Sequence, residues 1–260
     1  HYNTALLSLW SAGGRREIRR IPQPPEHAGT TWSCAVSPNG SQFAAVGKGL
    51  RIWRTAELTA DVSAAGAAAE PEISEKAGNS CVVFSPRGDR LAYLDVESWQ
   101  PFRPRILIRS LDPAGTPRVL ATNCHSNFIQ IFDFLPKSGH FAYVTDERMI
   151  RILDPDAGTV LKEFPTIPRG QRDTSFVSNM RCNPDESRFA VVTPNGLGIE
   201  ILDARQGNLL YAFPEEPGAV WWLAWSPDGR YMAVSRANGE IAVWDMKGLE
   251  DQLASLGLGI

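Results

Sequence analysis

Hydrophobic and polar residues alternate along short stretches of this chain, and these stretches recur at a regular interval. Five of them are "CAVSPNGSQFAAV", "CVVFSPRGDRLAYL", "IFDFLPKSGHFAYV", "MRCNPDESRFAVV" and "LAWSPDGRYMAVS". Alternation with a period of two predicts a β-strand with one buried face. The Asn-Gly, Arg-Gly-Asp and Asp-Gly turns supply the positive φ that hairpins need. The pattern therefore predicts five antiparallel hairpins.

A second set of strands follows the hairpins and sets the period. The turn prolines stand at 38, 86, 136, 184 and 227, and the closing strands are "LRIWRTA", "ILIRSLD", "IRILDPD", "IEILDAR" and "IAVWDMK". Trp10 in the opening stretch "TALLSLWSAGGRREIRRIP" lies 43 residues before Trp53, so this stretch is the same closing strand one period early. A repeat of about 40–45 residues with four strands per unit indicates a β-propeller.

We assign the chain to an all-β class with five complete repeats and a partial N-terminal one. Residues 1–260 form a single propeller domain with units at about 1–22 (partial), 23–56, 70–112, 117–156, 159–205 and 208–246, followed by a tail at 247–260.

The first strand of each unit has one apolar face, formed by the residues four and two positions before the proline. These are Cys34 and Val36, Val82 and Phe84, Phe132 and Phe134, Met180 and Cys182, and Leu223 and Trp225. Because all ten are apolar, we predict that they pack between neighbouring blades.

The stretch "WSPDGRYMAVSRANGEIAVWD", from Trp225 to Asp245, resembles the WD-repeat family, including its terminal Trp244-Asp245. The family places a His eleven residues before the proline; His27 stands there before Pro38, whereas Glu216 takes that position before Pro227. The buried His–Ser–Trp–Asp network of the family is therefore incomplete. The tail "GLEDQLASLGLGI" resembles the end of propellers at the C-termini of bacterial multidomain proteins.

The resemblance implies two ways to close the ring. In this family the outermost strand of the last blade comes from the N-terminus. Five blades could close with Arg15–Pro22 sealing the blade of Ala219–Asp245, which leaves "ALLSLW" surplus. In the alternative, the chain is the C-terminal part of a larger propeller, and "ALLSLW" belongs to a blade begun upstream.

Composition and charge restrict the partners. The net charge of −3 and pI near 5.9 give no general attraction to nucleic acid or anionic membrane, and no apolar run is long enough to cross a bilayer. The four cysteines have no CxxC pairing, and Cys34, Cys81 and Cys182 fall in predicted strands. We interpret them as reduced and structural, which favours a cytoplasmic location.

We find no catalytic, metal-binding or cofactor-binding motif. Arg15, Arg16, Arg19 and Arg20 share one strand; they could bind phosphate, but a charged edge strand is the favoured interpretation. "LDPDAGT" has the Asp spacing of a calcium loop, yet its twelfth residue is Pro165 rather than Glu, so we interpret it as a turn. A Cys124-His125 nucleophile pair is disfavoured because adjacent residues rarely reach that geometry.

The insertion "VESWQPFRPR", Val96–Arg105, is the main candidate for function. Its Trp and Arg are residue types enriched at interface hot spots, although Trp99 and Phe102 could instead pack on the neighbouring blade. The expected contact residues are Trp99, Phe102, Arg103, Arg169 and Arg172.

From these features we expect a non-catalytic scaffold for a protein or peptide partner, either a monomer or part of a larger chain. The alternative is a propeller enzyme, a hydrolase or lyase, or the recognition module of an upstream catalytic domain.

Overall fold

The repeated sheets are present in the computed structural model. It describes residues 7–11, 16–21, 33–59, 71–76, 81–100, 102–111, 115–122, 124, 131–166, 179–193 and 195–258. The chain divides into two compact units, His1–Thr122 and Asn123–Ile260.

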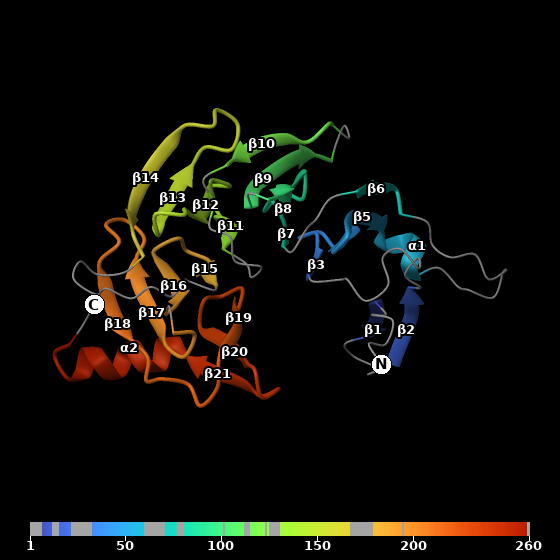
Figure 1. Ribbon diagram of the computed structural model, residues 1–260. Helices are drawn as coiled ribbons and strands as arrows, with labels where there is room; N and C mark the ends of the chain where they lie inside the picture. The colour runs from blue at the N-terminus through green and yellow to red at the C-terminus, as the bar shows by residue number, and fades with distance from the viewer. Residues whose placement is uncertain are drawn as a thin grey trace. The chain divides into compact units, whose positions relative to one another are not determined.

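The first unit holds two four-stranded antiparallel sheets whose strands are neighbours in chain order (Figure 1). One consists of β3 (Ser33–Val36), β4 (Gln42–Val46), β5 (Gly49–Arg54) and β6 (Ile73–Lys76), and the short helix α1 (Thr55–Thr59) follows β5. The other consists of β7 (Val82–Phe84), β8 (Arg90–Trp99), β9 (Phe102–Ser110) and β10 (Arg118–Ala121).

The second unit holds three sheets of the same kind and a helix. The first comprises β11 (Phe132–Phe134), β12 (Phe141–Val144), β13 (Met149–Leu153) and β14 (Val160–Pro165). The second comprises β15 (Met180–Cys182), β16 (Arg188–Val192), β17 (Ile199–Asp203) and β18 (Leu209–Ala212). The third has three strands, β19 (Val220–Trp225), β20 (Tyr231–Arg236) and β21 (Ile241–Asp245), and leads into helix α2 (Met246–Ser255).

Successive sheets within each unit meet at their first strands. Strand β3 contacts β7 in the first unit, and β11 contacts β15 and β15 contacts β19 in the second. Four-stranded meanders that adjoin at their first strands are the blades of a propeller. The predicted fold class, an all-β propeller with five repeated sheets, is therefore confirmed.

Each sheet packs one face against the opposite face of the next. In the second unit, Ile199 and Ile201 of β17 share one buried cluster with Leu223, Met232 and Val234 of the following sheet. In the first unit, a matching cluster joins β4 and β5 to β7, β8 and β9. The apolar alternation of the sequence thus supplies a continuous core between neighbouring blades.

The prediction about the first strands is confirmed for most positions and stays a prediction for β3, the first strand of the first four-stranded sheet in its unit. Val82, Phe84, Phe132, Phe134, Met180, Cys182 and Leu223 are buried, and Trp225 is half-buried. Cys34, however, is exposed, and Val36 is 56% exposed. Only a two-stranded sheet precedes β3 in the described part of the first unit, and it covers the second and third strands of this blade rather than the first.

That two-stranded sheet is formed by β1 (Leu7–Ser11) and β2 (Arg16–Ile21). The strands are antiparallel, with Leu7 opposite Ile21 and Ser11 opposite Arg16. Ile21 is buried with Trp53, Ala45 and Leu58 of the next sheet and helix. The opening stretch is therefore a strand pair, whereas the pairing of Arg15–Pro22 with Ala219–Asp245 and the total number of blades stay predictions.

The tail contains a helix that the sequence pattern did not indicate. The carboxylate of Asp245 accepts a hydrogen bond of 3.0 Å from the backbone N–H of Gly248, which makes Asp245 the N-cap of α2. Met246 is buried and Leu249 packs against the core of the last two sheets. None of the described helices is long and apolar enough to cross a membrane.

Candidate functional site

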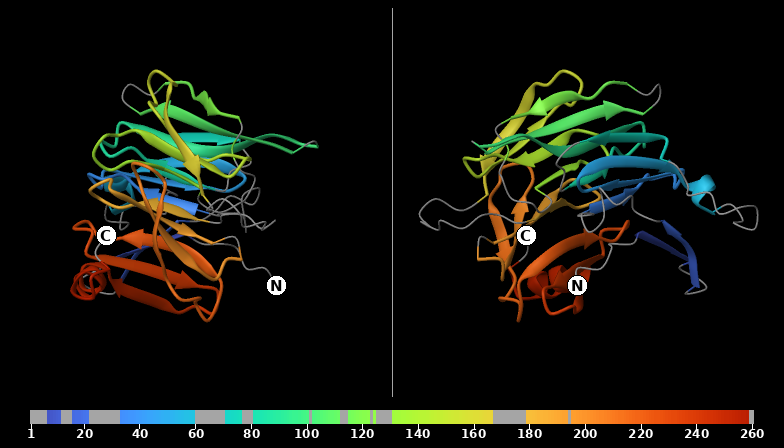
Figure 2. Two further views of the ribbon diagram at one scale, coloured as in Figure 1. Left: turned by 90° about the vertical axis from the view of Figure 1, so that its left-hand side faces the viewer. Right: turned by 45° about the vertical axis from the view of Figure 1, so that its right-hand side comes forward.

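The insertion Val96–Arg105 is the far end of a β-hairpin rather than an irregular loop. Strands β8 and β9 have ten and nine residues, whereas their neighbours β7 and β10 have three and four. Strand β7 pairs with Leu91–Tyr93 and β10 pairs with Ile106–Ile108. Beyond those residues, β8 and β9 pair only with each other among the described strands, so the hairpin projects past its sheet (Figure 2).

One arginine of the insertion fixes the base of this projection. Arg105 Nε donates a hydrogen bond of 2.8 Å to Asp95 Oδ2, and its Nη1 donates one of 3.2 Å to Glu97 Oε1. Asp95 is buried and Glu97 is exposed, so the arginine bridges the sheet and its projecting part. Arg105 therefore orders the hairpin.

The predicted contact residues are only partly described. Trp99 stands opposite Phe102 at the tip of the hairpin, and Arg103 stands opposite Ser98. Phe102 is half-buried and Arg103 is exposed. The side chain of Trp99 and all of Arg169 and Arg172 lie outside the described residues. The structure thus places three of the five predicted residues at one tip, and their contact with a partner stays a prediction.

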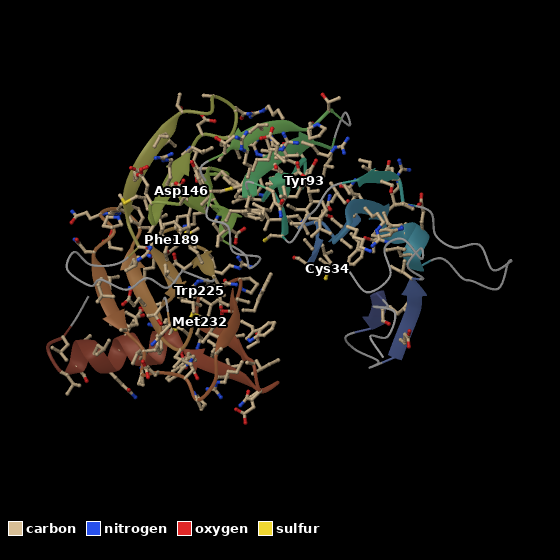
Figure 3. All side chains as sticks on the ribbon, in the orientation of Figure 1. Cys34, Tyr93, Asp146, Phe189, Trp225 and Met232 are labelled. Carbon is tan, nitrogen blue, oxygen red and sulfur yellow. The ribbon has the colours of Figure 1, made fainter. Side chains whose placement is uncertain are left out.

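The second unit has a cleft that the sequence reasoning missed. Its volume is about 450 Å³, and it lies at the turns that join the first and second strands of the last two sheets. Trp225 lines the cleft, and its indole N–H has no hydrogen-bond partner in the described part of the chain (Figure 3). Lys137, Arg188, Arg230 and Lys247 bring positive charge to it, and Asp185, Asp228 and Glu250 bring negative charge.

The carboxylates of the cleft are engaged in structural bonds. Partial burial acts to raise the pKa of Asp185, but hydrogen bonds from Ser187 and Asn183 outweigh it and lower the pKa overall. The hydrogen bond from the Ser226 hydroxyl lowers the pKa of Asp228. Glu250 forms an ion pair with Arg188. The lowered pKa values keep Asp185 and Asp228 ionised at neutral pH, so these two carboxylates are poor general acids.

A strained residue lies beside the cleft. Glu186 has a φ of 65° at a turn position where three of the other four repeats have a glycine, namely Gly40, Gly88 and Gly229. A non-glycine residue in this region is uncommon. Its Oε1 accepts a hydrogen bond of 2.6 Å from the backbone N–H of Ser138 in the turn of the neighbouring sheet. The bond between the two turns accounts for Glu at this position.

Side chains from the first strands of the three sheets of the second unit contact one another in a row. Asp133 of β11 is 3.6 Å from the Arg181 guanidinium of β15, which lies over the Trp222 ring of β19 at 4.9 Å. Burial raises the pKa of Asp133, and the nearby arginine opposes that shift. A single carboxylate paired with arginine offers no second titratable group to share acid–base catalysis.

The cysteines are free, and the structure gives no sign of reactivity. Burial raises the pKa of Cys124 to about 12 and also raises that of Cys182. Thiols with such pKa values are protonated and poorly nucleophilic at neutral pH. Cys81 lies directly before β7 rather than within a strand. Within the described ranges, no group of three or more His, Cys, Asp or Glu residues could hold a metal ion.

Glu216, which stands where the WD-repeat pattern has a His, forms its own hydrogen-bond network. Glu216 is buried; its Oε2 accepts a hydrogen bond of 2.7 Å from Arg236 Nε, and its Oε1 accepts one of 3.2 Å from the Trp244 indole. The Trp244 ring also packs 4.7 Å from that of Phe213. Glu216 thus ties the segment before β19 to β20 and β21. The sequence showed the substitution but not its partners.

Comparisons with known proteins agree with this architecture. The family model described as "WD domain, G-beta repeat" matches residues 207–245. The chain is also similar to Protein tipD of Dictyostelium discoideum, with 26% identity over 110 residues, which is 41% of this chain and 17% of that protein.

Proposed function

We propose that this chain, a WD-repeat β-propeller, is a non-catalytic platform that binds a protein or peptide partner through the tip of the β8–β9 hairpin. The fold of this family commonly serves protein interactions. The observation that supports the hairpin as the contact is its projection past β7 and β10 with a base fixed by Arg105.

A preordered hairpin suits binding for an energetic reason. Ordering a flexible loop on association costs conformational entropy. A hairpin whose base is already ordered by the hydrogen bonds of Arg105 avoids much of that cost. Trp99, Phe102 and Arg103 then sit on a fixed backbone at its tip. Aromatic residues and arginine contribute most at interface centres because they bury large areas and form several directed bonds.

The remaining chemistry of the described residues favours binding over catalysis. The cleft carboxylates are held by turn bonds, Asp133 is paired with Arg181, and the pKa of Cys124 is about 12. No observation favours the hydrolase or lyase alternative. A cytoplasmic location is part of the proposal and is supported by four free cysteines.

The test compares the hairpin tip with a distant position on the same sheet. Trp99→Ala should weaken binding of the isolated partner by roughly 2 kcal/mol or more, which is about 30-fold. A double change, Phe102→Ala with Arg103→Glu, should weaken it at least as much. Titration calorimetry gives the affinities, and circular dichroism checks that the fold is retained.

The matched control is Val119→Thr on β10, which is exposed on the same sheet. It should leave affinity unchanged. Full binding by both tip variants would exclude the hairpin as the contact. Loss of fold together with binding would instead mean that Trp99 and Phe102 pack on the neighbouring blade.

A further inference from the structure

The cleft beside Trp225 is built entirely from the second unit. Its volume of about 450 Å³ lies in the range of roughly 300–1,000 Å³ that is typical of ligand clefts. Its lining residues run from Lys137 to Glu250, so all of them belong to Asn123–Ile260. The walls of the cleft are therefore defined within one compact unit.

Three successive turns that contribute to the lining are joined to one another. Glu186 Oε1 accepts hydrogen bonds from the backbone N–H groups of Lys137, at 2.5 Å, and Ser138, at 2.6 Å. These bonds tie the β11–β12 turn to the β15–β16 turn. A Cβ atom on Gly229 would lie 3.5 Å from Pro184 Cδ, so the β15–β16 turn also contacts the β19–β20 turn.

Helix α2 supplies the rest of the wall and is held in place. Lys247 and Glu250 of this helix line the cleft, and Glu250 forms an ion pair with Arg188 of β16. Met246, at the start of the helix, is buried in the core of the last two sheets. The cleft is therefore preformed, which lowers the entropic cost of binding a ligand.

The acidic residues of the lining are used in bonds within the unit. Asp185 Oδ1 accepts a hydrogen bond of 2.8 Å from the backbone N–H of Ser187. Asp228 Oδ1 accepts one of 2.5 Å from the Ser226 hydroxyl. Glu250 is the partner of an arginine. These bonds reduce the attraction of the three carboxylates for a cationic ligand.

The lysines of the lining keep more of their charge available. Lys137 is exposed, and its ammonium has no hydrogen-bond or ion-pair partner among the described residues. Lys247 Nζ lies 3.4 Å from Asp251 Oδ1, but both side chains are 68% exposed, so solvent screens this pair. The lining therefore attracts an anion more strongly than a cation.

Trp225 adds a donor that lacks an acceptor. Its indole N–H is buried and has no hydrogen-bond partner in the described part of the chain (Figure 3). A buried donor without an acceptor is unfavourable, and a ligand that supplies an acceptor removes that cost. The lysines and the indole thus favour the same kind of ligand, one that is negatively charged and rich in acceptor oxygens.

The distribution of the basic residues indicates the shape of this ligand. They come from the β11–β12 turn, strand β16, the β19–β20 turn and helix α2. Arg188 and Arg230 are already paired with Glu250 and Asp245. Positive groups spread over several elements suit a series of carboxylates along a chain better than one compact phosphate.

We propose that this cleft binds an acidic segment of a partner protein, a short run of Glu or Asp residues. Its carboxylates pair with Lys137 and Lys247, and its backbone lies against Trp225. This site goes beyond the contact at the β8–β9 hairpin, because it uses other residues and lies wholly in the second unit.

The experiment follows the ¹H–¹⁵N signal of the Trp225 indole in the full-length protein, with Trp225→Phe to assign it. The probe is a tetraglutamate peptide with blocked ends, and the control probes are blocked tetraglutamine and inorganic phosphate at equal ionic strength. Tetraglutamate should shift the signal in a saturable way, and neither control should. The absence of a shift with tetraglutamate, or an equal shift with phosphate, would overturn the proposal.

A pair of charge reversals tests the contribution of the cleft itself. Lys137→Glu should weaken tetraglutamate binding by about tenfold or more, because it replaces attraction with repulsion. Lys162→Glu is the matched control, since Lys162 is exposed on β14 of the same unit, outside the lining; it should change affinity less than about twofold. Equal weakening by both variants would mean that overall charge attracts the peptide, which overturns the proposal.

A second variant keeps the test decisive if Lys137→Glu fails to fold. Lys247→Glu lies on the exposed side of α2 and should weaken binding by about fivefold or more. Unchanged affinity in this variant would contradict the assigned role of α2. Because the probe is not the partner of the hairpin, failure of this proposal leaves the proposed function of the hairpin untouched.

Discussion

Ile199 of β17 and Ile241 of β21 occupy the same register in consecutive sheets, opposite Val192 and Ser235 respectively. Ile199 is fully buried, whereas Ile241 is 71% exposed. The residue type and local strand geometry are the same. The difference is that the sheet β19–β21 packs over the face of Ile199, while no described sheet of the second unit packs over that of Ile241. Burial here depends on what stacks on a strand rather than on the strand itself.

A second contrast between the two sheets lies in the residues after the third strand. Asp154 and Asp203 are each followed four residues later by a glycine with positive φ, Gly158 at 68° and Gly207 at 74°. Such a glycine lets the chain reverse into a hairpin. Four residues after Asp245 stands Leu249, which disfavours positive φ, and the chain continues as a helix. The glycine therefore accompanies the tight hairpin into β14 and β18, and β21 without it leads into a helix.

The largest expected effect tests the contrast in burial. Ile199→Ala should lower the free energy of unfolding by about 2–5 kcal/mol, because it leaves a cavity between two packed sheets. Ile241→Ala should change it by less than about 0.5 kcal/mol. Urea unfolding of both variants measures the difference. Similar losses at the two positions would show that the face of β21 is covered in solution.

A smaller effect is expected at the network that anchors β21. Glu216→Ala should lower stability by about 1–3 kcal/mol, because the Trp244 indole N–H and the Arg236 guanidinium both lose the carboxylate that accepts their hydrogen bonds. Glu216→Gln keeps an acceptor for Trp244 and should cost less. Glu215→Ala, at the exposed neighbouring residue, is the matched control. The variants are compared by urea unfolding and by the fluorescence of the tryptophans; a stable Glu216→Ala protein would contradict this role.

The smallest effects concern the two aspartates. Asp203→Ala should loosen the β17–β18 turn, and Asp245→Ala should fray α2 only. Hydrogen bonding from Gly248 N–H and then from Arg230 lowers the pKa of Asp245 below its ordinary value near 3.8. The stabilisation of the helix is therefore complete above pH 3.8 and is lost as the pH falls through the lower pKa of the folded state.

Asp245→Asn provides the control for this pH dependence. Asparagine caps helices nearly as well as aspartate but does not titrate in this range. Amide exchange of α2 between pH 5 and pH 2 should therefore change in the parent protein more than in Asp245→Asn. The same pH response in both proteins would place the titrating group elsewhere.

The fold was predictable because its signal is local and repeated. Short apolar or alternating stretches such as "CVVF", "FDF" and "LAW" indicated the strands, and the spacing of the prolines indicated the repeat. The candidate site was harder to predict from the sequence. The hairpin at Val96–Arg105 stood out only as an insertion. The hydrogen bonds of Arg105 that order its base depend on the register between β8 and β9. The partners of Glu216 and the cleft beside Trp225 involve residues far apart in sequence, which periodicity cannot pair.

The sequence by itself determined the propeller class and the alternating strand faces, because alternation and turn residues act within a few positions. Only the tertiary structure decided which of these apolar faces are buried. Cys34, Val36, Ile241 and Val243 fit the buried pattern as well as Met180 or Ile199 do, yet they are exposed. Burial requires a neighbouring sheet, and no residue specifies its own neighbour.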